Sequence, residues 1–198
     1  FMKAAVFGAG NMGLDIAQVF AVKGHDVVVR DISDELIQKG EERLKASLAR
    51  QVEKGRRTQA EADAISAKIV FTTNMRQAAD ADLIVEAIVE NVSIKKDLFR
   101  QLDTIVKPEA IFATNTSSIS PTELASATKR ADRFIGMHFF NPATVMKLIE
   151  VIRGANTSQE TFTTVYELAE SLGKEPIEVA EAPGFVVNKI LIPMINEA

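Results

Sequence analysis

Short apolar runs alternate along the first 116 residues with longer stretches that have helical spacing. β-Branched and aromatic residues dominate these runs, and glycine or polar residues end them, as is typical of buried strands in a parallel sheet. The runs predict five strands, at residues 2–7, 26–31, 68–73, 82–88 and 110–116.

Three helices are predicted between these strands. The first lies in residues 11–24 and stops at Gly24, the second begins after Ser33, a residue suited to the N-cap, and the third covers residues 93–106. Apolar residues line one face of the first two helices: Ile16, Val19, Phe20, Ile37, Leu44 and Leu48.

Strands separated by helices predict an α/β fold with a Rossmann-type, doubly wound and mainly parallel sheet. Neither repeats nor low-complexity linkers interrupt the pattern before Pro183. We therefore expect one dinucleotide-binding domain over residues 1–182, and a second unit from residue 183 onward.

Composition and charge exclude several classes of function. A net charge of −4 without a basic stripe argues against a nucleic-acid partner. The 198 residues include no cysteine, which excludes disulfides and fits a reducing compartment, so a cytoplasmic protein is expected. No uncharged apolar run approaches the roughly 18 residues of a membrane-spanning helix, and no signal core begins the chain, so no membrane association is expected.

A glycine motif lies where the first strand meets the first helix. Gly8, Gly10 and Gly13 form G-x-G-x-x-G, the turn that lets a dinucleotide pyrophosphate approach backbone N–H groups at a helix start. Asp31 ends the second strand about 20 residues on, where a carboxylate binds ribose hydroxyls and repels a 2′-phosphate. This favours NAD over NADP, although Arg30 weakens the preference, and a solvated strand end is the alternative interpretation of Asp31.

His138 and Glu150 each lie within an apolar run, where either group alone would be costly to bury. The two can satisfy each other, either as a structural pair or as an acid/base couple in which the carboxylate orients the imidazole. His25 precedes the second strand and is interpreted as a packing or helix-ending residue. No metal site is expected, because the two histidines are far apart and no cysteine accompanies them.

Several motifs together resemble the L-3-hydroxyacyl-CoA dehydrogenase family, which includes 3-hydroxybutyryl-CoA dehydrogenases. They are "GAGNMG", "VEAIVENVSIKKDLF", "NTSSIS", "RFIGMHFFNPATVMKLIEV" and "APGFVVNKIL". The resemblance implies an NAD-dependent oxidoreductase of fatty acid and butanoate metabolism. It would interconvert L-3-hydroxyacyl-CoA and 3-ketoacyl-CoA through a His/Glu acid-base pair.

The resemblance also implies roles for individual residues. The catalytic set would be His138, Glu150, Ser117 and Asn188. The NAD-binding set would be Gly8, Gly10, Asn11, Met12, Gly13, Asp31, Glu90, Lys95, Asn115, Ser117 and Asn141. The acyl-CoA substrate would contact Ser47, Lys54 and Ser117, the first two being seven residues apart and so on one face of a helix.

Two features depart from the family pattern. Asp15 stands where the family usually has a small residue, often glycine, and we expect its carboxylate to point sideways into solvent. Residues 183–198 resemble only the first helix of the family's all-helical domain. Their apolar face, Val187, Ile190, Leu191 and Met194, predicts self-association, such as a homodimer. The resemblance also implies that Asn188 and the cover of the acyl site are misplaced or absent, so weak or absent activity of this chain is expected.

Two alternative functions remain open. The same scaffold could oxidise a hydroxy acid that carries no CoA, or it could serve as a non-catalytic NAD-binding or structural domain. Residues Ser47 and Lys54 favour a CoA substrate, and the presence of His138, Glu150 and Ser117 together favours an enzyme.

Overall fold

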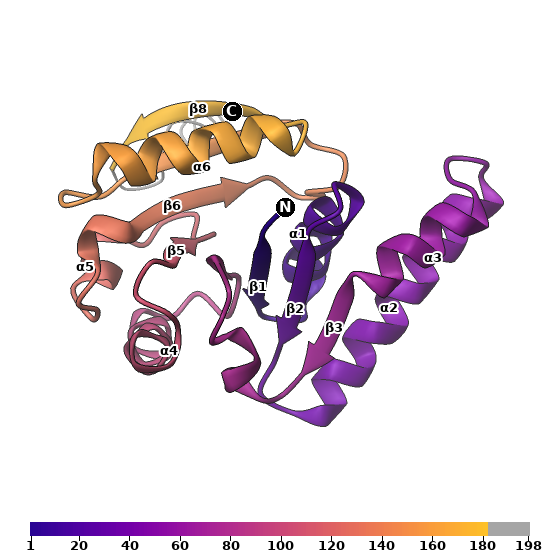
Figure 1. Ribbon diagram of the computed structural model, residues 1–198, viewed down its shortest axis with the longest axis horizontal. Helices are drawn as coiled ribbons and strands as arrows, with labels where there is room; N and C mark the ends of the chain where they lie inside the picture. Colours follow the sequence, from indigo (N-terminus) through magenta and orange to yellow (C-terminus); the bar gives the residue numbers. More distant parts are fainter. Residues whose placement is uncertain (182–198) are drawn as a thin grey trace, which may run out of the picture.

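Within residues 1–181, eight strands form one sheet in the order β3-β2-β1-β4-β5-β6-β7-β8. The computed structural model describes residues 1–181 of the chain (Figure 1). The strands are β1 Lys3–Phe7, β2 Asp26–Arg30, β3 Ile69–Thr72, β4 Leu83–Glu86, β5 Ile111–Thr114, β6 Phe134–Phe139, β7 Leu148–Arg153 and β8 Glu175–Ala180. Every pairing is parallel except that of β6 with β7. The doubly wound, mainly parallel sheet is confirmed.

Helices cover both faces of this sheet. They are α1 Asn11–Val22, α2 Asp34–Glu53, α3 Gln59–Ala67, α4 Val92–Ile105, α5 Pro121–Ala125 and α6 Gln159–Ser171, with short 3₁₀ turns η1 Met75–Ala78 and η2 Ala131–Arg133. Apolar residues of α1, α2, α3 and α6 form one core with alternate strand residues, and α4 and α5 form a second core on the opposite face. This two-sided burial explains why the strands are apolar throughout.

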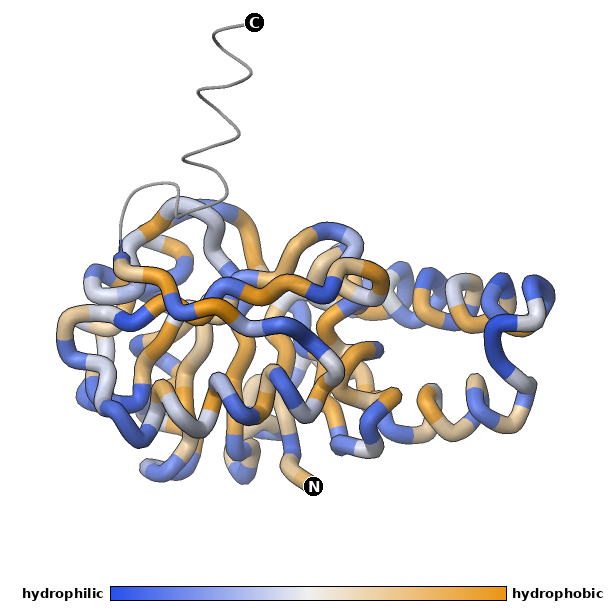
Figure 2. Tube along the Cα trace, turned by 90° about the horizontal axis from the view of Figure 1, so that it is seen from above, coloured by the Kyte–Doolittle hydropathy of each residue, from blue (hydrophilic) through white to orange (hydrophobic). Residues whose placement is uncertain are grey.

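The five predicted strands and three predicted helices are all present. Leu36 N–H donates to Ser33 Oγ at 3.3 Å, so Ser33 caps α2 as expected. Helix α3 was not predicted, and it pairs with α2 in a hairpin of helices that projects from the sheet (Figure 2).

The antiparallel pair β6–β7 has a register that matters for function. His138 and Glu150 are direct cross-strand partners in this ladder. Directly opposite residues on one face of an antiparallel pair lie close enough for their side chains to touch. The twelve-residue separation in sequence therefore becomes contact through the strand pairing.

Candidate functional site

The glycine turn connects β1 to α1 at the carboxyl edge of the sheet. A Cβ on Gly8 would lie 2.4 Å from Ala87 O, and one on Gly13 would lie 1.8 Å from Gly8 O, so both positions need glycine for the turn itself. A Cβ on Gly10 would meet nothing within 4 Å. Helix α1 starts directly after Gly10 without a side-chain cap. The backbone at Gly10 thus borders open space at the start of α1, where the uncapped first N–H groups of a helix can bind a dinucleotide pyrophosphate.

Asp31 fixes this turn and also faces a cavity. Its Oδ2 accepts from Ala9 N–H at 2.7 Å, so it is more than a solvated strand end. The cavity measures about 590 Å³, and its wall includes Gly8, Gly10, Arg30, Asp31 and Ile32 together with apolar residues of α4. Crevices of this kind, beside the point where the strand order reverses between β1 and β4, are where open α/β sheets bind ligands.

A second cavity adjoins the first, because Ala87 and Ile88 line both. It measures about 470 Å³. Seven of the residues expected to contact cofactor or substrate line it: Met12, Glu90, Lys95, Asn115, Ser117, His138 and Asn141. The structure therefore brings together, from four parts of the chain, side chains that the resemblance assigned to one site.

His138 and Glu150 form a buried pair in the wall of this cavity. Nδ1 of His138 lies 2.9 Å from Glu150 Oε2. Glu150 is fully buried and His138 is 7% exposed, so the imidazole reaches the cavity while the carboxylate lies behind it. Because an ionised carboxylate only accepts hydrogen bonds, this contact places a proton on Nδ1. The ring of Phe140 packs beside the imidazole, with centroids 4.6 Å apart.

Asn115 ties the strand β5 to β6 next to this pair. Its side-chain oxygen accepts from Phe139 N–H at 2.8 Å, and its own N–H donates to Glu86 O at 2.9 Å. The first bond fixes the end of β6, one residue beyond His138, and the second, from the backbone N–H, joins Asn115 to the end of β4. Asn115 thus has a clear structural role in addition to its position in the cavity wall.

A buried ion-pair cluster beside the cavity includes Glu86, which was not among the candidate site residues. Lys95 Nζ lies 2.7 Å from Glu86 and 3.1 Å from Glu90. Glu86 is fully buried, and it also accepts from Thr114 Oγ1 at 2.7 Å and Ile88 N–H at 2.8 Å. The sequence does contain a signal for Glu86. It is a glutamate inside the apolar strand run "DLIVEAI", and a buried glutamate needs a buried cation as its partner.

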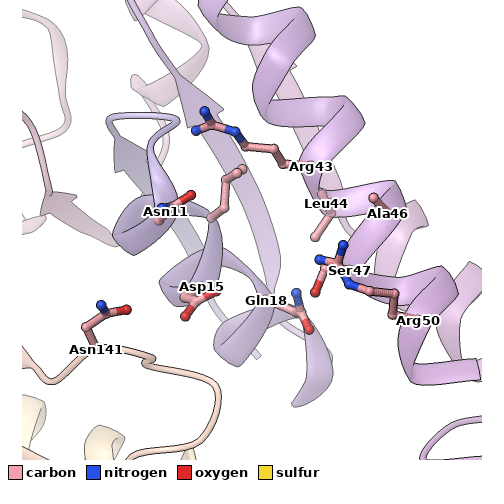
Figure 3. A pocket seen from close by; sticks show the side chains of 10 residues that line it. Asn11, Asp15, Gln18, Arg43, Leu44, Ala46, Ser47, Arg50 and Asn141 are labelled. Atoms are coloured by element: carbon pink, nitrogen blue, oxygen red, sulfur yellow. The ribbon is translucent and has the colours of Figure 1, made fainter. Parts of the chain in front are cut away.

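A third cavity lies between α1 and α2 (Figure 3). Residues Arg43, Ser47 and Arg50 of α2 line it, opposite Asn11, Asp15 and Gln18 of α1. Ser47 thus lies in the wall of this cavity. Lys54 follows the last residue of α2 and does not line this cavity, whereas the two arginines, which the motifs did not single out, do.

The expectation that Asp15 points into solvent is wrong. The carboxylate is half-buried and faces the backbone of Ala143 and Thr144 in the β6–β7 loop. Burial raises its pKa, and hydrogen bonding from the amides of Thr144 and Ala143 and the charge of Lys174 oppose that rise. In Figure 3 it lies on the side of α1 nearer Asn141.

The other candidates are placed as follows. His25 packs against Phe20 and accepts from Met2 N–H through Nδ1 at 3.1 Å, so its packing role is confirmed. Asn188 and the apolar face of residues 183–198 lie outside the described residues. Within residues 1–181, no cluster of His, Asp and Glu is arranged to hold a metal ion. None of the described helices is both long and apolar enough to cross a membrane.

Comparisons with a family model and with individual known proteins point to the same family. Residues 3–182 match the model of the 3-hydroxyacyl-CoA dehydrogenase NAD-binding domain. The chain is 52% identical to 3-hydroxybutyryl-CoA dehydrogenase of Clostridioides difficile and 54% identical to a probable 3-hydroxybutyryl-CoA dehydrogenase of Deinococcus radiodurans, covering 70% of each. In both cases the match takes in the whole chain.

A solved structure agrees with this family assignment. The crystal structure of (S)-3-hydroxybutyryl-CoA dehydrogenase from Ralstonia eutropha superposes with a TM-score of 0.96 at 48% identity. The match covers 99% of this chain and 69% of that one. Together with the glycine turn, Asp31 and the matched motifs, these similarities show that the chain belongs to the 3-hydroxyacyl-CoA dehydrogenase family and contains its NAD-binding domain.

Proposed function

We propose that this protein interconverts L-3-hydroxyacyl-CoA and 3-ketoacyl-CoA with NAD as the hydride carrier, as in the 3-hydroxybutyryl-CoA/acetoacetyl-CoA pair. The observation that carries the proposal is the buried His138–Glu150 pair, which opens into a cavity that adjoins the dinucleotide crevice. An imidazole and a cofactor site in one connected space are what hydride transfer from a secondary alcohol needs.

The residues present fit NAD. Gly8, Gly10, Asn11, Met12 and Gly13 would hold the pyrophosphate and its surroundings at the start of α1, and Asp31 would accept from the adenosine ribose hydroxyls. The nicotinamide half would lie against Glu90, Lys95, Asn115, Ser117 and Asn141. When bound, NAD would accept the hydride from C3 of the hydroxyacyl group.

His138 supplies the proton transfer. With Nδ1–H donated to Glu150, the other ring nitrogen, Nε2, accepts the substrate hydroxyl proton in the oxidising direction. Glu150 stabilises the imidazolium that forms, as an orienting carboxylate does in a hydrolase triad. In the reducing direction the imidazolium returns the proton, and the Ser117 hydroxyl polarises the 3-keto oxygen. Asn188 would help to order the same site.

The cavity between α1 and α2 favours a CoA thioester over a hydroxy acid without CoA. Arg43 and Arg50 present two guanidinium groups on either side of Ser47 in the sequence of α2. Guanidinium groups bind phosphates bidentately, and coenzyme A carries several phosphates. Lys54, one residue beyond α2, would add a further positive charge near the far end of this surface.

NADH consumption with acetoacetyl-CoA tests the proposal. Wild type should turn over acetoacetyl-CoA, even if only slowly, but not free acetoacetate. His138→Ala should bind NADH normally, by fluorescence, and lose about a thousandfold in kcat, within the range for a general acid or base. Equal turnover by His138→Ala would contradict the assigned base. Turnover of free acetoacetate alone would favour the substrate without CoA, and NADH binding with no turnover would favour the non-catalytic domain.

The assembly and location are proposed from the sequence. The helical spacing of Val187, Ile190, Leu191 and Met194 supports a homodimer or other self-association, and the absence of cysteine supports a cytoplasmic location. Light scattering tests the first: a monodisperse monomer across the accessible concentration range would contradict it.

A further inference from the structure

Ser117 lies on a loop whose backbone is held by side chains. The loop, residues 115–120, joins β5 to α5, and Ser117 lines the cavity proposed for the nicotinamide half of NAD. The N–H group of Thr116 donates to Thr114 Oγ1 at 3.3 Å. Those of Ser118 and Ile119 donate to Thr116 Oγ1 at 3.3 and 3.0 Å. The residues on both sides of Ser117 are therefore anchored to threonine hydroxyls.

The hydroxyl of Thr116 uses its full hydrogen-bonding capacity. Thr116 is 1% exposed, and its Oγ1 donates to Oε1 of Glu90. A hydroxyl has one proton and two lone pairs, and the N–H groups of Ser118 and Ile119 occupy the acceptor side. Because donation to the carboxylate fixes the direction of the O–H bond, it also directs the lone pairs toward these two amides.

Glu90 is itself held in place by a closed ring of polar contacts. Its Oε2 lies 3.1 Å from Lys95 Nζ, and the same Nζ donates to Glu86 Oε1 at 2.7 Å. Glu86 Oε2 accepts from Thr114 Oγ1 at 2.7 Å, and Thr114 Oγ1 accepts from the N–H of Thr116, which closes the ring. The ring is buried except at Glu90, whose side chain is 42% exposed.

Thr116 is the member of this ring that joins it to the loop backbone next to Ser117. A buried polar group that loses its partner costs free energy, so the bonded arrangement is favoured over any other position of the loop. Thr116 does not line the cavity, whereas Ser117, Glu90 and Lys95 do. Thr116 can therefore affect chemistry in the cavity only through its neighbours.

We infer that Thr116 is a positioning residue: its hydroxyl, oriented by Glu90, holds loop 115–120 and thereby sets the Ser117 hydroxyl toward the reacting oxygen of the substrate. The catalytic consequence rests on the proposed function, but the anchoring of the loop does not. The opposite interpretation is that Thr116 only fills space beneath the loop. A methyl group in place of the hydroxyl would then serve equally well, so Thr116→Val separates the two interpretations.

Amide hydrogen exchange on the full chain tests the anchoring. Thr116→Val keeps the shape of the side chain but removes the hydroxyl, and we expect exchange at Ser118 and Ile119 to rise about fivefold, the order of one lost hydrogen bond. Thr116→Ser keeps the hydroxyl and should leave exchange at both amides within about twofold of wild type. Thr161→Val is the matched control and should leave these amides unchanged, because Thr161 of α6 is also buried but lies outside the cavity wall.

Turnover of acetoacetyl-CoA gives the second readout. Thr116→Val should lower kcat about tenfold, because a misplaced Ser117 hydroxyl no longer polarises the keto oxygen in the transition state, and Thr116→Ser should restore most of the rate. In a Ser117→Ala background, Thr116→Val should lower kcat by less than about twofold, since the group that it positions is already absent. A general loss of stability would instead lower kcat by the same factor in both backgrounds.

Two results would overturn the inference. One is unchanged exchange at Ser118 and Ile119 in Thr116→Val. The other is an equal loss of kcat from this change with and without Ser117. Should Thr116→Val fail to fold, Glu90→Ala carries the exchange test: it removes the acceptor of the Thr116 hydroxyl, so exchange at the same amides should rise, and unchanged exchange would again overturn the inference. A wild type that does not turn over acetoacetyl-CoA would contradict the proposed function, while the exchange results would still decide whether Thr116 anchors the loop.

Discussion

The two histidines of this chain lie in two regions where Nδ1 of the ring has opposite kinds of hydrogen-bond partner. His138 in β6 and His25 before β2 are 7% and 9% exposed, so burial alone does not separate them. Nδ1 of His138 faces the Glu150 carboxylate, whereas Nδ1 of His25 accepts a backbone N–H from Met2. The partner therefore demands a proton on Nδ1 in one case and a lone pair in the other.

This difference separates a chemical role from a structural one. A carboxylate behind Nδ1 makes Nε2 a base and stabilises the imidazolium, and His138 opens into the cavity that adjoins the dinucleotide crevice. A backbone donor at Nδ1 favours the neutral ring, and His25 packs between Phe1 and Phe20. The identity of the group at Nδ1 is thus more informative than burial or residue type.

The largest expected effect comes from removing the carboxylate. Glu150→Gln should lower kcat with acetoacetyl-CoA by about a hundredfold to a thousandfold, because the imidazolium loses its counter-charge and the tautomer is no longer fixed. Steady-state kinetics measure this. Glu178→Gln, an exposed glutamate on the neighbouring strand β8, is the control and should stay within twofold. Comparable losses of kcat in both variants would contradict the specific role of Glu150 behind His138.

An effect on stability is expected at Glu86, the buried carboxylate beside the cavity. Lys95→Met should lower the free energy of unfolding by about 3 kcal/mol or more, because it leaves fully buried Glu86 without its cation. Denaturant unfolding measures the change. Lys96 lies on the same helix as Lys95, and Lys96→Met breaks a more exposed pair with Glu123 of α5. This change should cost less than about 1 kcal/mol. Similar costs for both would show that the buried cluster is not stabilising.

The smallest expected effect concerns His25. Burial chiefly, and the charge of the nearby N-terminus, lower its pKa, so protonation favours the unfolded chain. Its contribution to stability is present above the pKa of an unfolded histidine, about 6.5, and is lost as pH falls. His25→Gln should therefore cost more stability at pH 8 than at pH 5, measured by denaturant unfolding. A larger cost at pH 5 would reverse the assigned sign.

Much of the fold could be predicted from the sequence because its parallel strands are buried on both faces. Continuous apolar runs and helical spacing located β1 to β5, α1, α2 and α4, and the capping residue Ser33 located the start of α2. Helix α3 has a weaker apolar pattern, with only Ala62 and Ile65 buried, and it escaped detection.

Site residues could be predicted where the chemistry requires a particular residue type. They could not be predicted where tertiary packing determines which residues meet. Gly8, Gly13 and Asp31 follow from the turn, and the His138–Glu150 pair follows from the cost of burying either group alone. Its antiparallel register depends on long-range pairing that no local pattern records. Asp15 illustrates the same limit: its spacing says which helix face it occupies, but not that Asn141, from the segment between β6 and β7, would line the same cavity.

The most direct test is a long-range ¹H–¹⁵N NMR spectrum of the imidazole rings at pH 8, where two histidines give two patterns and His25→Gln assigns them. The account predicts that His138 carries its proton on Nδ1 and His25 on Nε2. A spectrum with the His138 proton on Nε2 would contradict the central claim, because Glu150 would then not be orienting the ring for catalysis.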